Sequence, residues 1–392
     1  MSTLLAGLAK FCQISSISVI FLFRNTSNEE LLCSLKFDLI FIFTLFAGLG
    51  DDMCGRIGVY KSWLSWKTLD KRALEYVARM NETDGVALRH YAETGSYPVS
   101  HPDLVSMPAF ELIDNLVHRY ANGLGLLAEL RGGRGERYEE LCSQSAAALK
   151  ISFMISALKH ERFPRRHKGR NLKKMSLKDS LLLALTLALG NEVEGKQIGR
   201  MMIEAYRRGY FFDKDQYPVF HFILRLFCDW SGEEPPEWEA NPLQESIMNK
   251  LFLNWKEESC ERLAPYVLAA CDYHTHRCKP SGIKGFYEFC NGDWTRFPVE
   301  LLMLYRLRYW IGLENPQVDH PIMVGAFTQM PEKIPLVPDA LTSAVLAQMV
   351  KQGYNEKAIY ASFCGRRVEL MTLFSSSFMM LKKYAALTGK LR

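Results

Sequence analysis

Apolar residues recur three and four positions apart along most of the chain from Met53 onward, the spacing that gives an α-helix one buried stripe. This period predicts helices over residues 69–80, 108–130 and 137–159. Further helices are expected at residues 176–190, 197–208, 217–229, 243–272, 298–311, 340–350, 356–363 and 368–387. Alternation of apolar and polar residues with a period of two, rich in β-branched side chains, is almost absent. The sequence therefore predicts an all-α protein.

Two of these segments carry signals for helix ends. Residues 176–190 begin with Ser176 and Asp179, which resemble a capping box, and end at Gly190, a residue suited to a C-terminal cap. Their apolar positions run nearly all round the helix, so we expect this helix at the centre of its domain. The segment 298–311 starts with a proline, which suits the first turn of a helix, and stops before a glycine.

Breaks in this pattern divide the chain into five parts, with two packed helical domains at its centre. We expect an apolar N-terminal extension (1–52), an N-terminal helical domain (53–160), a basic linker (161–175), a C-terminal helical domain (176–321) and C-terminal helices (322–392). Between residues 162 and 174 the linker holds seven Lys and Arg residues, together with a proline and a glycine that favour a solvated connection. The alternative interpretation is a patch for nucleic acid or an acidic partner.

The N-terminal extension contains two strongly apolar runs, SVIFLF and LIFIFTLFAGLG. The second is about a dozen residues long, shorter than the ~20 needed to cross a bilayer. A membrane-associated anchor and a translated upstream region, with the natural start at Met53, are both open, and the change of pattern near residue 53 favours the second. Ten cysteines without a C-x-x-C pair then predict reduced thiols in a cytoplasmic protein.

Residues with metal-binding and catalytic side chains gather in one short segment, CDYHTHRCKPSGIKGFYEFCNGDW. It holds Cys271, His274, His276, Cys278 and Cys290. These are ligands that zinc prefers, but the spacing differs from the C-x₂₋₄-C and H-x₃₋₅-H pairs of structural zinc sites. We expect a helix to end near residue 272 and a loop to carry the histidines beside its negative end, with no metal or cofactor bound.

The usual sequence motifs of enzymes are missing. The chain has no G-x-S-x-G, no H-E-x-x-H, no Walker-type loop and no G-x-G-x-x-G that follows a strand. We therefore expect no catalytic residues and no enzyme activity.

Charge is distributed unevenly. The whole chain has a net charge of +5, yet residues 229–261 contain nine acids against two bases, a local charge of −7. Tryptophans alternate with these acids, and rigid aromatic anchors surrounded by charge are typical of protein-binding hot spots. The alternative is an ordinary solvated face. The predicted partner-binding residues are Asp229, Glu233, Glu234, Glu237, Trp238, Glu239, Glu257 and Glu258.

The segment 298–311 places Glu300 in the first turn of its helix, where a carboxylate interacts favourably with the positive helix end by about 0.3–1 kcal/mol. We expect Arg306 and Arg308 to project away from the core. The predicted core face of this helix consists of Leu301, Leu304, Tyr305 and Tyr309.

This region carries a resemblance. Phe297 and Glu300 form an aromatic-x-x-Glu step that opens a helix ending in Gly312, and a proline segment, residues 319–321 (Asp-His-Pro), follows. The arrangement, over residues 176–321, resembles the C-terminal domain of the PoNi-type immunity proteins, which protect bacteria from polymorphic DNase toxins, including those of type VI secretion. The chain departs from the family at two points. The family step usually has a Trp preceded by Gly-Tyr, where this chain has Phe297 preceded by Thr295 and Arg296. The acid expected after the later proline is also missing after Pro321.

The resemblance implies a cytoplasmic antidote without catalysis of its own. Such a protein binds a cognate toxin with a basic nuclease domain and occludes the active site or the substrate channel of that toxin. It contacts no nucleic acid directly, and no membrane unless the N-terminal extension is real. The alternatives are a helical adaptor or regulatory module with another partner, and a zinc-dependent enzyme.

Overall fold

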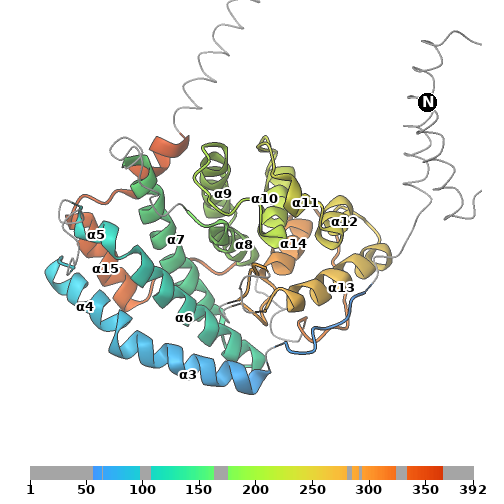
Figure 1. The fold of residues 1–392 in the computed structure, drawn as a ribbon, viewed down its shortest axis with the longest axis horizontal. Coiled ribbons are helices and arrows are strands. Elements are labelled where there is room, and N and C mark those ends of the chain that lie inside the picture. Colours follow the sequence, from blue (N-terminus) through green and yellow to red (C-terminus); the bar gives the residue numbers. More distant parts are fainter. Residues whose placement is uncertain are drawn as a thin grey trace, which may run out of the picture. The chain divides into compact units, whose positions relative to one another are not determined.

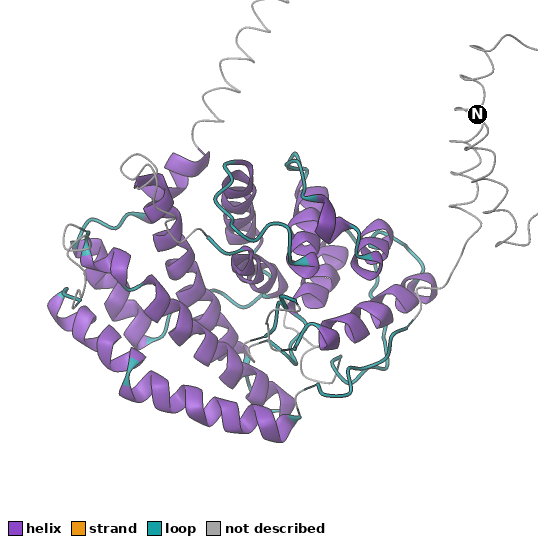
Figure 2. Cartoon of the chain, in the orientation of Figure 1, coloured by secondary structure: helices purple, strands orange, loops and turns teal. Residues whose placement is uncertain are grey.

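The computed structural model of this protein consists of helices joined by loops in the part it describes. That part comprises residues 56–63, 65–97, 107–162, 175–279, 285–290, 294–323 and 333–364. Within these ranges no strand occurs, and an isolated bridge joins Met175 to Phe211. The all-α prediction is confirmed. The apolar extension, most of the basic linker and the predicted helix at 368–387 lie outside the described residues (Figures 1 and 2).

The helices follow the predicted segments closely in most places. They are α3 (Trp66–Glu82), α4 (Asp84–Thr94), α5 (Ala109–Leu112), α6 (Asp114–Gly133), α7 (Glu139–Arg162), α8 (Ser180–Ala188), α9 (Glu192–Arg207), α10 (Pro218–Ser231), α11 (Ala240–Leu243), α12 (Ser246–Asn254), α13 (Cys260–His276), α14 (Val299–Trp310) and α15 (Ala340–Lys351), with a 3₁₀ turn, η2 (Leu177–Asp179), before α8. Residues 356–364 are also helical.

The prediction of one helix over residues 243–272 is wrong. Three helices occupy this region because two polar side chains cap new helix starts. Glu245 accepts the amides of Ile247 and Met248 at the start of α12, and Ser259 accepts the amide of Arg262 at the start of α13. The expected helix end near residue 272 is also wrong, since α13 continues to His276.

Helices α6 and α7 form a long pair that α3 and α4 flank, and α15 packs against α4 (Figure 1). Close packing of α6 depends on its glycines. A Cβ atom at Gly125 would lie 2.5 Å from the Trp294 ring, nearer than real Cβ contacts allow. By length and composition α7 could cross a membrane, but most of its apolar stretch is buried inside the protein, as in the core helix of a globular domain.

Helix α8 lies at the centre of the second group of helices, as its apolar composition predicted. Every residue from Ser180 to Ala188 is buried, and α8 packs against α7, α9, α10 and α14. Buried residues from α4 through α15 join in one continuous hydrophobic cluster. The division into two helical domains at residues 161–175 stays a prediction.

Candidate functional site

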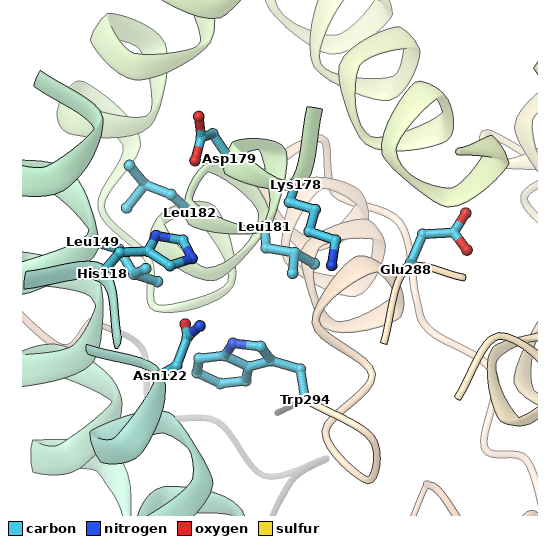
Figure 3. A pocket seen from close by; sticks show the side chains of 9 residues that line it. All are labelled: His118, Asn122, Leu149, Lys178, Asp179, Leu181, Leu182, Glu288 and Trp294. Atoms are coloured by element: carbon cyan, nitrogen blue, oxygen red, sulfur yellow. The ribbon is translucent and has the colours of Figure 1, made fainter. Parts of the chain in front are cut away.

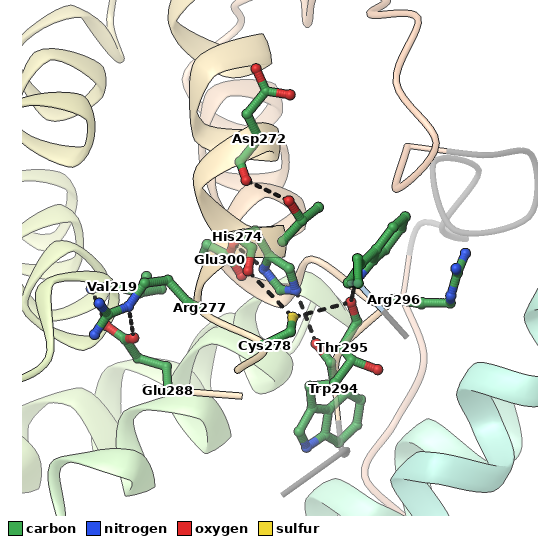
Figure 4. Close-up of polar contacts among 12 residues, drawn as sticks. Val219, Asp272, His274, Arg277, Cys278, Glu288, Trp294, Thr295, Arg296 and Glu300 are labelled. Carbon is green, nitrogen blue, oxygen red and sulfur yellow. Dashed lines mark hydrogen bonds and ion pairs between the residues drawn. The ribbon is translucent and has the colours of Figure 1, made fainter. Parts of the chain in front are cut away.

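The His- and Cys-rich segment occupies the last turns of α13, where it meets the first turn of α14 and the loop before it. His274 is fully buried. Its Nδ1 lies 2.7 Å from Oε1 of Glu300, and its Nε2 lies 3.1 Å from the carbonyl oxygen of Trp294 (Figure 4). Its ring stacks on Phe289 at 4.0 Å between centroids. Glu300 is in the first turn of α14, as predicted, but it is also buried and paired with a histidine, which sequence reasoning missed.

This pair fixes the proton state of the histidine. Burial lowers the pKa of His274, but the Glu300 carboxylate and the Cys278 sulfur together raise it by more, and the net pKa is well above its ordinary value. Because a carbonyl oxygen only accepts, Nε2 donates to Trp294 while Nδ1 donates to Glu300, so the ring is an imidazolium. Both nitrogens are then occupied by protons, and neither has a lone pair for a metal ion.

The cysteines of the segment also serve the fold. The Cys278 thiol lies 3.3 Å from the carbonyl oxygen of His274 and 3.6 Å from that of Thr295. Burial raises the pKa of Cys278 and of Cys271, so both remain protonated thiols at neutral pH. Among the residues that the structure describes, no group of three or more His, Cys, Asp and Glu side chains is arranged to hold a metal ion.

Two residues before His274 in α13, a fully buried carboxylate gathers four donors. Asp272 accepts Nε and Nη2 of Arg56 at 3.0 and 3.2 Å, the amide of Gly58 at 3.0 Å, and Nε2 of His320 at 3.2 Å. Ile322 donates its amide to Nδ1 of His320, so the His320 proton is on Nε2 and this ring is neutral. Burial raises the pKa of Asp272, but the hydrogen bonds from Arg56 and Gly58, with the charge of Arg56, together lower it by more. The net pKa is below the ordinary range.

The same helix end holds a segment from far earlier in the chain. Residues 56–60, which we call the N-terminal clasp, lie along α13. Besides the bonds to Asp272, the Tyr60 amide donates to Oγ1 of Thr275 at 2.8 Å, and Nε2 of His276 lies 3.0 Å from the Gly58 carbonyl oxygen. The polar side chains at the end of α13 thus bind the backbone of the N-terminal clasp. This role explains why so many polar and titratable side chains lie close together there.

A second buried carboxylate, Glu129 of α6, fixes the loop before α14. It accepts the amide of Trp294 at 2.9 Å and that of Arg296 at 2.7 Å. Trp294 has a φ of 61°, the one left-handed non-glycine residue in the described part of the chain. Such a conformation costs about 1–3 kcal/mol, and the carboxylate stabilises it. Its sequence signal is faint: an acid within the apolar run GLGLLAEL.

A small cavity with a mixed polar and apolar lining lies beside this loop (Figure 3). Its volume of about 30 Å³ has room for about two water molecules. Burial, together with Asp213, raises the pKa of Asp179 at its edge to about 8. Beside the cavity, Glu288 pairs with Arg277 and accepts the amide of Val219 at 3.0 Å (Figure 4). The residues lining it are His118, Asn122, Leu149, Lys178, Asp179, Leu181, Leu182, Glu288 and Trp294.

The predicted partner-binding residues lie around the ends of α10, α11 and α12, and bases outside the acidic window pair with several of them. The ion pairs are Glu233 with Arg200 at 2.6 Å, Glu239 with Lys214 at 3.0 Å and Glu257 with Arg262 at 2.6 Å; Asp229 pairs with Lys256 at 2.7 Å, within the window. The charge that a partner meets is therefore smaller than the sequence suggested. Glu234, Glu237 and Glu258 are exposed.

The tryptophans of the acidic window face inward more than predicted. The Trp238 ring packs edge-on against Tyr206 and His221, at 5.1 and 5.8 Å between centroids, and Trp255 is only 2% exposed. Less of Trp238 is thus open to a partner than the sequence suggested, and its role in binding stays a prediction. Trp230 is half-buried and stacks on Trp310.

Comparison of the chain with protein-family models, with curated proteins and with solved structures gives no match. The resemblance to the PoNi-type proteins therefore stands on the aromatic-x-x-Glu step and residues 319–321. The structure places this step in the buried network, where Phe297 packs against Tyr138 and Trp294.

Proposed function

We propose that this protein is a toxin-neutralising antidote, which binds a cognate basic toxin and blocks its active site or its substrate channel. The observation that carries the proposal is the concentration of acidic side chains at residues 229–261 on a chain that is positive overall. A nuclease domain binds the phosphate backbone through Lys and Arg, so an acidic protein surface competes for the same groove.

One ion pair within this surface is open to exchange. The side chains of Asp229 and Lys256 are 40% and 54% exposed, whereas Glu233, Glu257 and Lys214 are each less than a quarter exposed. Pairs between exposed side chains contribute only ~0–1 kcal/mol each, so an acid can exchange its internal partner for a base of the toxin at little cost. The remaining negative potential speeds encounter with a basic partner by ~10–10³-fold at low salt.

The buried polar networks bear on the same proposal, because they serve the fold of the chain. His274, Glu300, Asp272 and Glu129 are buried, and each holds backbone or side-chain groups of the chain itself. What these residues provide is a fixed scaffold, and binding to a partner is left to the outer surface.

The test is co-expression of the full chain with the product of the gene adjacent to its own, followed by co-purification and a growth assay. We expect growth to be restored and a stable complex to be recovered. A toxic neighbour that is expressed, yet neither bound nor neutralised, would overturn the proposal.

A charge reversal then tests the acidic surface. The variant E234K/E237K should weaken toxin affinity about tenfold or more at low salt and reduce its salt dependence. The matched control is E75K/E82K, which reverses two exposed acids on α3 and should leave affinity unchanged. Equal affinities for the two variants would remove the acidic surface from the proposal.

A further inference from the structure

Three helices, α10, α12 and α14, end at one place on the surface. The indole of Trp255, just after α12, donates to Asp229 of α10 at 2.8 Å. Trp230 of α10 stacks on Trp310 of α14, with ring centroids 5.3 Å apart and planes inclined by 27°. The arrangement of the three helices can be followed in Figure 1.

A buried arginine ties two of the three ends together. Arg308 of α14 is fully buried, so the prediction that it projects away from the core is wrong. Its guanidinium donates to the carbonyl oxygens of Trp255 and Glu257 after α12, the latter at 2.9 Å, and of Glu314 after α14, at 3.2 Å from Nε. Arg306 is also buried and donates to the Ala188 carbonyl oxygen. Backbone carbonyls satisfy these charges, which makes their burial possible.

Apolar side chains are exposed where these ends meet. Tyr309 is 56% exposed and Ile311 is 42% exposed, although Tyr309 was predicted to face the core. Single exposed apolar residues are normal on a protein surface, but here two of them adjoin a half-buried tryptophan pair. The tryptophan-pair patch, as we call this surface, consists of Trp230, Glu258, Tyr309, Trp310, Ile311 and Glu314.

The charge of the patch suits a cation. Glu258 and Glu314 are exposed, and neither forms an ion pair with another described residue. Lysines of the chain already lie over the neighbouring indoles, Lys196 at 5.0 Å from the Trp230 centroid and Lys256 at 5.0 Å from that of Trp255. Aromatic faces with nearby acids are good hosts for Arg and Lys side chains.

We propose that the tryptophan-pair patch is the contact that receives an Arg- or Lys-bearing protruding segment of a basic protein partner. This inference rests on the proposed function and names the toxin's basic surface as the occupant. A guanidinium would stack on the exposed Tyr309 ring while Glu258 and Glu314 neutralise it. Aromatic residues at the centre of an interface dominate binding energy, so this patch is the anchor and the acids at residues 233–239 are the rim.

The test measures affinity of the full-length chain for a catalytically inactive form of the co-expressed toxin. The variant Y309A/I311A should bind about 30-fold or more weakly, with an unchanged melting temperature. The control L74A/V86A removes two apolar side chains that are equally exposed on α3 and α4, and should bind as the wild type does.

A second variant keeps the test sharp if the first is poorly folded. E258K/E314K changes only exposed side chains and should weaken binding about tenfold at low salt, compared with E75K/E82K. Wild-type affinity in both patch variants would overturn this inference and leave the antidote proposal standing. If the wild-type chain itself forms no complex with the toxin and does not neutralise it, both proposals fall together.

Discussion

Replacing Asp272 by Asn should release the N-terminal clasp without unfolding the rest of the protein. The carboxylate accepts two bonds from Arg56, one from the Gly58 amide and one from His320. Asn is nearly isosteric but has a single acceptor oxygen, and its NH₂ group faces donors that need an acceptor. At least one buried donor therefore loses its partner.

The magnitude follows from which donors are buried. The Arg56 side chain is 49% exposed, so water compensates most of its loss. Leaving the Gly58 amide or the His320 Nε2–H group unpaired costs about 1–3 kcal/mol each. We expect the clasp to be about 2–4 kcal/mol less stable, which corresponds to about 30-fold or faster exchange of its amide hydrogens.

Hydrogen exchange resolved by residue is the assay, read at the amides of Gly58 and Tyr60. The matched control is Asp70→Asn, which removes an exposed ion pair with Arg134, both side chains being roughly half exposed, and should change stability by less than ~1 kcal/mol. Wild-type exchange at Gly58 and Tyr60 in Asp272→Asn would refute the conclusion that this carboxylate holds the clasp.

Three further changes test the rest of the network. Because Glu300 raises the pKa of His274, the wild-type protein should lose up to ~1.4 kcal/mol of stability per pH unit above pH ~6.5, until the folded pKa is passed; Glu300→Gln should flatten this slope in urea denaturation at several pH values. Arg308→Met leaves buried carbonyl oxygens without donors, and should lower the free energy of unfolding by ~3–5 kcal/mol in chemical denaturation. Gly125→Ala should cost ~1–3 kcal/mol and shift the fluorescence of Trp294, whose ring would have to move.

Local sequence signals predicted helices well because a helix depends on neighbours three and four residues away. The segment 298–311 became α14 (Val299–Trp310), and the apolar segment 176–190 became the central helix. The wrong predictions in the same region concern contacts between residues far apart in the sequence. The charge of Arg308 predicted exposure, since only carbonyl oxygens from separate loops make its burial favourable.

The candidate site was harder to predict for the same reason. Arg56 and Asp272 are 216 residues apart, and Arg200 and Glu233 are 33 apart, so neither pair has a signature within one segment. Counting charges within residues 229–261 consequently overstated the negative surface. The sequence predicted a structural role rather than metal binding for the His and Cys positions of α13, and this stays a prediction. What this helix end holds, a segment from before α3, has no trace in the spacing of those residues.

Three of the residues that carry the family resemblance, Phe297, Glu300 and His320, lie inside the buried network, whereas Asp319 and Pro321 are exposed. Phe297 packs in the core, Glu300 binds His274, and His320 binds Asp272. Side chains in such positions shape the loop before α14 and the end of α13, and cannot touch a partner in this conformation. Under the proposed function, these buried residues preserve the scaffold, and partner recognition is expected to rest on exposed residues such as Tyr309 and Ile311.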